Sequence, residues 1–120
     1  MILVDTSVWI DHFRVTEPNL VRILASGDVV IHPFVVGELA LGTLKNRIVI
    51  LSLLHDLPEA PLVSDKEALY FLEKHRLTGR GIGYIDLHLL ASVALTGRGK
   101  IWTKDKRLSH VAETIRLAVG

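Results

Sequence analysis

The sequence predicts an α/β fold, a three-layer α/β/α sandwich around a central and mainly parallel sheet. Short apolar runs rich in β-branched residues alternate along the chain with longer segments of helical periodicity. This alternation is typical of parallel strands joined by right-handed helical crossovers. The chain has 120 residues, a length that suits one compact domain spanning residues 1–120.

Local signals at the ends of segments define the elements of the first half. Met1–Val4 is a fully apolar run, as in a strand buried on both faces, and Asp5 supplies an N-cap for the helix that follows. Pro18 and Gly27 mark the two ends of the next helix. In order, we expect a strand at Met1–Val4, a helix through Phe13, a helix at Glu17–Ala25, a strand at Val29–His32, a helix from Pro33 and a helix at Arg47–His55.

The second half contains a capping box and a glycine-rich loop. Ser64 and Glu67 have the spacing of a capping box, which predicts the start of a helix. Three glycines at positions 79, 81 and 83 indicate a flexible, basic loop. In order, we expect a short strand at Leu62 and Val63, a helix at Ser64–Leu77, the loop from Thr78 to Gly83, a helix at Tyr84–Leu95, a strand at Lys100–Thr103, a short helix from Lys104 and a last strand at Thr114–Ala118.

Composition limits the possible partners and compartments. A net charge of +1 predicts no strong long-range attraction to nucleic acid, so RNA binding would need a local basic patch. The absence of cysteine excludes disulfides and thiolate metal sites and is compatible with a cytoplasmic protein. We expect no membrane segment, because no apolar run approaches the ~20 residues that span a bilayer. A hydrophobic content of 49% suggests that a partner covers some apolar surface, and we expect a homodimer.

Three of four candidate acids stand where parallel sheets bind ligands, beyond the carboxyl ends of the strands. Asp5 follows the first expected strand, Glu38 lies one turn into the helix after the second, and Asp105 follows the third. Asp86 begins the long helix after the glycine loop. A surface acid usually has a cation three or four positions away on its helix, but Glu38, Asp86 and Asp105 have none at these offsets.

Clustered carboxylates need a positive partner. Two of them about 4 Å apart repel by about 4 kcal/mol at an effective dielectric constant of 20. With oxygen ligands and no cysteine, Mg²⁺ or Mn²⁺ suits such a site better than zinc. Such an ion would lower the pKa of a bound water and offset charge during attack on a phosphodiester. This is the chemistry of a hydrolytic nuclease.

Each acid also has an ordinary structural explanation. Asp5 could be only an N-cap, Asp86 and Asp105 could be first-turn acids that meet helix dipoles, and Glu38 could reach solvent along its helix. For any single acid, the structural explanation is as good as the explanation that it belongs to a functional site. The four together favour the site.

Four ordered segments carry a resemblance to a known family. They are DTSVWIDHFR, VVGELALG, GIGYIDLHLLASVAL and WTKDKRL, and each contains one of the four acids. Over essentially the whole chain, these segments resemble the PIN-domain family, and specifically the VapC toxins of type II toxin–antitoxin systems.

The resemblance implies an endoribonuclease of the PIN-like fold in which Asp5, Glu38, Asp86 and Asp105 bind Mg²⁺ or Mn²⁺. It also implies a homodimer, a cognate VapB-like antitoxin that occludes the site, and structured RNA substrates such as tRNA or ribosomal RNA. Ser7 and Thr103 match positions that commonly support the site of the family.

Basic residues near the acids are candidates for contact with RNA phosphates. Solvated surface cations are common, so each of them could equally be an ordinary surface residue. Trp9 and Trp102 lie among apolar residues and are expected in the core, and the histidines show no metal-ligand spacing. The candidates are Arg80 in the glycine loop and Lys104, Lys106 and Arg107 beside Asp105.

Rival functions fit less well. A phosphatase with an aspartyl nucleophile typically has a second acid two positions later, where this chain has Ser7, and the opening MILVD leaves no room for the acidic pair of a receiver domain. The remaining alternative is a catalytically inactive, PIN-like protein-binding module, against which the presence of all four acids argues. For the homodimer, we expect the apolar faces of the helices at Phe34–Leu44 and Ser64–Leu77 to meet a second copy.

Overall fold

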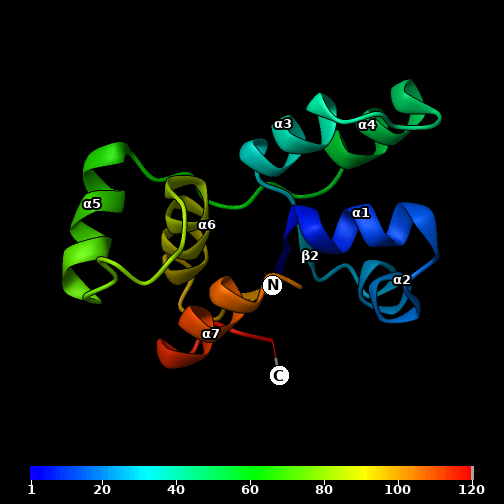
Figure 1. Ribbon diagram of the computed structural model, residues 1–120. Coiled ribbons are helices and arrows are strands. Elements are labelled where there is room, and N and C mark those ends of the chain that lie inside the picture. The colour runs from blue at the N-terminus through cyan, green and yellow to red at the C-terminus, as the bar shows by residue number, and fades with distance from the viewer. Residues whose placement is uncertain (120) are drawn as a thin grey trace.

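The structure, a computed structural model, describes residues 1–119. Figure 1 shows short strands at the centre with helices around them. The elements in chain order are β1 (Ile2–Val4), α1 (Thr6–Arg14), α2 (Pro18–Ala25), β2 (Val29–Val30), α3 (Pro33–Leu41), α4 (Arg47–His55), α5 (Asp65–Lys74), α6 (Tyr84–Ala94), β3 (Lys100–Trp102) and α7 (Lys106–Thr114).

The sheet is parallel, with β1 at its centre. Within residues 1–119 it has three strands in the order β2-β1-β3, and Leu3 pairs with Val30 on one side and with Ile101 on the other. In Figure 1, α1 and α2 lie to the right of the strands, and α5 and α6 lie to the left. The expected α/β sandwich with a parallel sheet is therefore confirmed.

The core lies between the sheet and the helices on either side. Leu3 and Val4 on the central strand are fully buried, and α6 packs against β3 and β1. Every residue from Leu87 to Val93 on α6 is buried, including His88 and Ser92. A helix that is buried nearly all round belongs to the interior of a domain, so α6 is the rigid support on which Asp86 stands.

Two expected strands were wrong. Leu62 and Val63 form no strand. The segment before them pairs instead at Glu59, which forms a parallel bridge with Ile31. Ile31 donates to the carbonyl of Pro58 and accepts from the N–H of Ala60, and the next residue, a proline, has no N–H with which to continue a ladder.

The strand expected at Thr114–Ala118 is reduced to a single bridge between Ala118 and Ile101. Helix α7 continues to Thr114, and Arg116 reverses the chain with a left-handed φ of 62°. After this reversal, Ile101 donates to the carbonyl of Leu117 and accepts from the N–H of Val119. The helix expected from Lys104 begins at Lys106, because Asp105 is its N-cap.

Two expected ends were too late, because the strand expected at Val29–His32 ends at Val30 and the helix expected at Ser64–Leu77 ends at Lys74. The start of that helix agrees with its sequence signal. The capping box of α5 is present, with Ser64 accepting from the N–H of Glu67 at 3.1 Å and Glu67 accepting from the N–H of Ser64 at 2.9 Å. The helix ends at Lys74, shortly before Arg76 adopts a φ of 54°. Within residues 1–119, no helix combines the length and apolar character needed to cross a membrane.

Candidate active site

Asp5 occupies the carboxyl end of the central strand and is only 7% exposed. Its Oδ2 accepts hydrogen bonds from Thr103 Oγ1 at 2.8 Å and from Ser7 Oγ at 3.0 Å. Although Asp5 stands at the N-cap position of α1, its side chain makes no capping hydrogen bond. A helix cap therefore does not explain this carboxylate, whose Oδ1 has no hydrogen-bond partner within residues 1–119.

Ser7 and Thr103 are themselves held in place. Their hydroxyl oxygens lie 3.3 Å apart, although the residues are 96 positions apart in the sequence. Ser7 Oγ accepts from the N–H of Lys104, and Thr103 Oγ1 accepts from the N–H of Asp105, both at 3.0 Å. The two hydroxyls thus connect the start of α1, the end of β3 and the start of α7 around Asp5.

Glu38 is exposed on α3, the helix that begins at the carboxyl end of β2. Its Oε1 accepts a hydrogen bond from Thr6 Oγ1 at 3.3 Å, and α3 packs against α1. Thr6 was not predicted from the sequence to be part of the site. Its position directly after Asp5 is the signal that could have indicated it.

Asp86 is half-buried in the first turn of α6, where its Oδ2 accepts from the N–H of Gly83 at 3.2 Å. Burial raises the pKa of the Asp86 carboxyl, and the negative charges of Asp5, Asp105 and Glu38 raise it further. Asp5, Asp105 and Glu38 therefore each lie within electrostatic reach of Asp86. Asp5 and Asp105 follow the carboxyl ends of β1 and β3, and the helix that carries Glu38 begins after β2.

Asp105 is exposed and has a structural role as well. As the N-cap of α7, it accepts from the N–H of Leu108 through Oδ1 at 2.9 Å. Its charge still contributes to the raised pKa of Asp86. The capping explanation is therefore correct for Asp105 but does not account for its position beside three other acids.

No lysine, arginine or histidine among residues 1–119 forms an ion pair with any of the four acids. Within the described residues, the ion pairs join Lys104 to Asp11 at 3.0 Å and to Glu17 at 3.7 Å, and His88 to Asp65 at 3.1 Å. The donor atoms around Asp86 are carboxylate oxygens, which Mg²⁺ and Mn²⁺ prefer. The chemistry of the donor set fits a hard divalent cation.

The four carboxylates do not form a closed set of ligands. Across residues 1–119, no three acidic or histidine side chains are close enough together to hold one ion as they stand. Ionised carboxylates without a counter-charge favour separation, so a bound cation would have to draw them closer together. The site is an open group of acids rather than a preformed cage.

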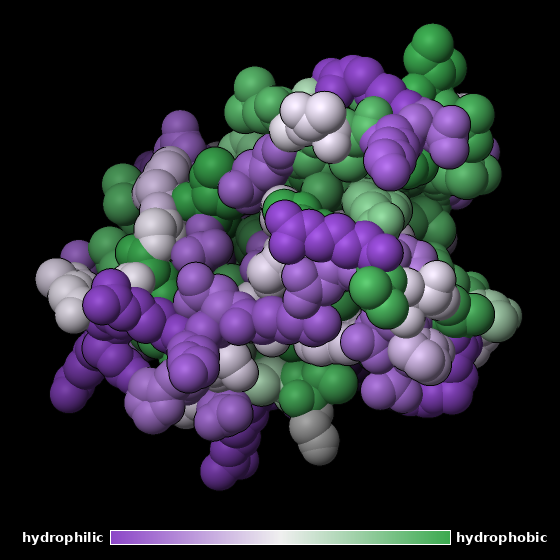
Figure 2. Space-filling model, turned by 45° about the vertical axis from the view of Figure 1, so that its right-hand side comes forward, coloured by the Kyte–Doolittle hydropathy of each residue, from purple (hydrophilic) through white to green (hydrophobic). Residues whose placement is uncertain are grey.

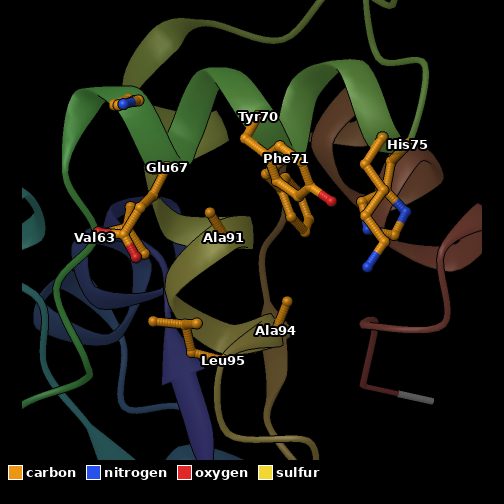
Figure 3. Close-up of a pocket in the computed structure, with 10 residues that line it drawn as sticks. Val63, Glu67, Tyr70, Phe71, His75, Ala91, Ala94 and Leu95 are labelled. Atoms are coloured by element: carbon orange, nitrogen blue, oxygen red, sulfur yellow. The ribbon is translucent and has the colours of Figure 1, made fainter.

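The cavity in Figure 3 lies elsewhere, between α5 and α6. It has a volume of about 510 Å³ and is lined mainly by apolar side chains, including Val63, Phe71 and Leu95. Within the described chain, none of the four acids lines it. The acid group is therefore separate from this cavity.

The four basic candidates differ in their surroundings. Lys104 is engaged by Asp11 and Glu17, whereas Lys106 is exposed and Arg80 is half-buried. Arg107 is exposed and its side chain lies against the backbone of Gly81. Among them, Lys104 is thus already neutralised by acids of the chain itself.

Aromatic and histidine side chains form interior contacts. Trp9 is 3% exposed, as expected of a core residue, and Trp102 is half-buried. His32 is buried and is the N-cap of α3, with Nδ1 accepting from the N–H of Phe34 at 3.0 Å. Burial and the nearby His88 lower the pKa of His32 to about 4, so it is neutral at physiological pH. Its position between a buried strand and Pro33 was the signal for this cap.

Comparisons with known proteins agree with the sequence motifs. Residues 2–114 match the family described as the PIN domain. Two proteins of Mycobacterium tuberculosis, from strains CDC 1551 / Oshkosh and ATCC 25618 / H37Rv, are both named Ribonuclease VapC32. Each is 50% identical to this chain over 108 residues, which cover 90% of this chain and 87% of the relative.

Neutralising Asp86 should stabilise the protein in the absence of metal. Because folding raises the pKa of Asp86, the folded chain binds this proton more tightly than the unfolded chain, and stability falls as the pH rises through that pKa. We expect Asp86→Asn to raise the melting temperature at pH 7 in EDTA by about 3 °C. The gain should disappear below about pH 4, where the acid is protonated in both states.

Scanning fluorimetry across this pH range measures the effect. Glu73→Gln, which removes an exposed negative charge on α5, is the control and should leave the melting temperature within about 1 °C. A lower melting temperature for Asp86→Asn than for the wild type at pH 7 would contradict the electrostatic account.

Proposed function

This chain belongs to the PIN-domain family, and we propose that it is a metal-dependent endoribonuclease, the toxin of a VapBC-type toxin–antitoxin pair. The observation that carries the proposal is the convergence of four carboxylates around Asp86 without a cation from the chain. The relatives named as ribonucleases support it, because the similarity extends over nearly the whole length of each protein.

We assign the metal to the four acids. Asp5, Glu38, Asp86 and Asp105 would hold Mg²⁺ or Mn²⁺ through their carboxylate oxygens. When bound, the cation would lower the pKa of a water molecule and offset the charge that develops on the phosphodiester during hydrolysis. The raised pKa of Asp86 supports this assignment, because a positive ion would relieve the repulsion that causes part of the shift.

The remaining side chains of the site would orient the acids. Thr103 and Ser7 both donate to Oδ2 of Asp5, which leaves Oδ1 as the oxygen that would bind the cation. Thr6 donates to Glu38 and in this way restrains an exposed and otherwise flexible side chain. Outer hydrogen bonds of this kind fix the direction of metal ligands in many proteins.

The substrate would be RNA in the cytoplasm, and structured RNAs such as tRNA or ribosomal RNA are the candidates that the family suggests. Arg80, Lys106 and Arg107 are the proposed phosphate contacts. Lys104 is a weaker candidate, since Asp11 and Glu17 already bind its ammonium group.

Exposed apolar residues support the proposed protein partners. Figure 2 shows hydrophobic side chains gathered toward the top of the molecule, over α3 and α4. On α4, Ile48 is 85% exposed and Leu53 is 61% exposed, and this face would receive the VapB-like antitoxin.

On α3 and α5, Leu41 is 90% exposed and Tyr70 is 69% exposed, and we assign these helices to the homodimer.

Purified protein should cut a total RNA pool into discrete products when Mg²⁺ or Mn²⁺ is present. We expect both EDTA and Asp5→Asn to abolish cleavage, because the first removes the cation and the second removes a charged ligand from the centre of the site. Gel analysis and sequencing of the product ends provide the measurement. If antitoxin-free protein binds metal but cuts no RNA, the inactive PIN-like binding module becomes the better interpretation.

Removing the hydroxyl of Thr103 should weaken the site without changing its charge. Thr103→Val preserves the shape of the side chain but loses the hydrogen bond to Asp5, and we expect Mn²⁺ affinity and RNA cleavage to fall by about tenfold or more. Thr103→Ser retains the hydroxyl and should stay close to the wild type. Equal activity of the two variants in the same cleavage assay would rule out an orienting role for Thr103.

The chain should sediment as a dimer at micromolar concentration. Tyr70→Asp, on the proposed dimer face, should shift it toward the monomer, because an unpaired charge in an apolar interface is costly to desolvate. Ile48→Asp changes an even more exposed apolar residue on α4 and should remain dimeric. A monomeric wild type in sedimentation velocity would overturn the proposed assembly.

A further inference from the structure

A glycine in the loop before α6 makes room for an arginine of α7. A Cβ atom added to Gly81 would lie 2.9 Å from Cδ of Arg107, 3.3 Å from its Nη1 and 3.4 Å from its Nε. The distal part of the arginine side chain therefore lies against Gly81, at a distance that a side chain at this position would prevent.

This contact joins two segments that carry acids of the site. Gly81 is two residues before Gly83, whose N–H donates to Oδ2 of Asp86. Arg107 is two residues after Asp105, the acid of the site that accepts from the N–H of Leu108 as the N-cap of α7. The arginine is thus anchored at the border of the acid group.

The guanidinium of Arg107 has no acceptor among the described residues. It forms no ion pair or hydrogen bond with any residue from 1 to 119, although four carboxylates lie in the same region. Lys104 differs, because Asp11 and Glu17 bind its ammonium group. A guanidinium has five donors in a planar fork that matches the oxygens of a phosphate, and those of Arg107 are available to an external acceptor.

We propose that Arg107, positioned by Gly81, binds a backbone phosphate of the RNA substrate at the border of the acid group. This inference rests on the proposed ribonuclease function and selects one residue among the basic candidates. Gly81 is a positioning residue, because its lack of a side chain lets Arg107 lie over the loop. The charge of Arg107 would attract the polyanion beside acids that repel it.

The role of the Arg107 charge is tested by measuring RNA affinity in EDTA, which prevents metal-dependent cleavage. The probe is a fluorescein-labelled, single-stranded RNA of 20 nucleotides, followed by anisotropy at several salt concentrations. We expect Arg107→Ala to weaken binding about tenfold and to reduce the slope of log affinity against log salt by about 0.7. Arg107→Lys should keep the slope and recover part of the affinity.

A matched control removes the same charge elsewhere. Arg98 is exposed in the loop before β3, at the opposite edge of the sheet, so Arg98→Ala should leave both affinity and slope unchanged. Under cleavage conditions, Arg107→Ala should raise KM for the RNA more than it lowers kcat. A residue that only supported the fold would not change the salt slope.

The role of Gly81 is tested against Gly79. Both glycines have a left-handed φ, +81° for Gly81 and +73° for Gly79, but a Cβ at Gly79 would meet nothing within 4 Å. Gly81→Ala and Gly79→Ala therefore both strain the loop. Only Gly81→Ala also displaces the side chain of Arg107. The displaced atoms belong to a flexible side chain, so the arginine should move while the fold remains.

Gly81→Ala should weaken RNA binding severalfold relative to Gly79→Ala, and adding it to Arg107→Ala should cause no further loss. Equal affinity of the two glycine variants would overturn the positioning role of Gly81. Unchanged affinity and salt slope in Arg107→Ala would overturn the phosphate site, while cleavage by the wild type would leave the proposed function intact. If the wild type neither binds nor cuts RNA, the proposed function fails together with this inference.

Discussion

The burial of an acid at the end of the central strand is the constraint around which this fold is arranged. Asp5 is 7% exposed, and a carboxylate so far from water is costly unless hydrogen bonds compensate for its lost hydration. Ser7 and Thr103 supply them from opposite ends of the chain, and their oxygens in turn accept the N–H groups of Lys104 and Asp105. The position of one carboxylate thus fixes how α1, β3 and α7 meet.

The other acids add charge to this position rather than cancelling it. The raised pKa of Asp86 records both its burial and the three carboxylates around it. Two cations lie at the border of this group: Lys104, which is paired with Asp11 and Glu17, and Arg107, which lies against Gly81. Negative charge at the centre with positive charge at the border suits a site that holds a divalent cation and draws a polyanion over it.

Features set by local sequence could be predicted, and those set by distant contacts could not. The helix at Arg47–His55 and the capping box of α5 depend on neighbouring residues, and both agree with expectation. The strand expected at Leu62 and Val63 failed because pairing with Ile31 depends on how the loop passes β2. The four acids could be named as candidates because three of them stand at a strand end or a helix start and Glu38 lies one turn into its helix. The contact between Gly81 and Arg107 joins distant segments and has no sequence signal.

The central claim is that the four carboxylates form one binding site for a divalent cation. Titration of metal-free protein with Mn²⁺ in a calorimeter tests it without any RNA. The account predicts saturable binding by the wild type, with affinity at least about tenfold weaker in Asp5→Asn and in Asp86→Asn. Binding that both substitutions leave unchanged, or a wild type that binds no Mn²⁺ at millimolar concentration, would contradict it.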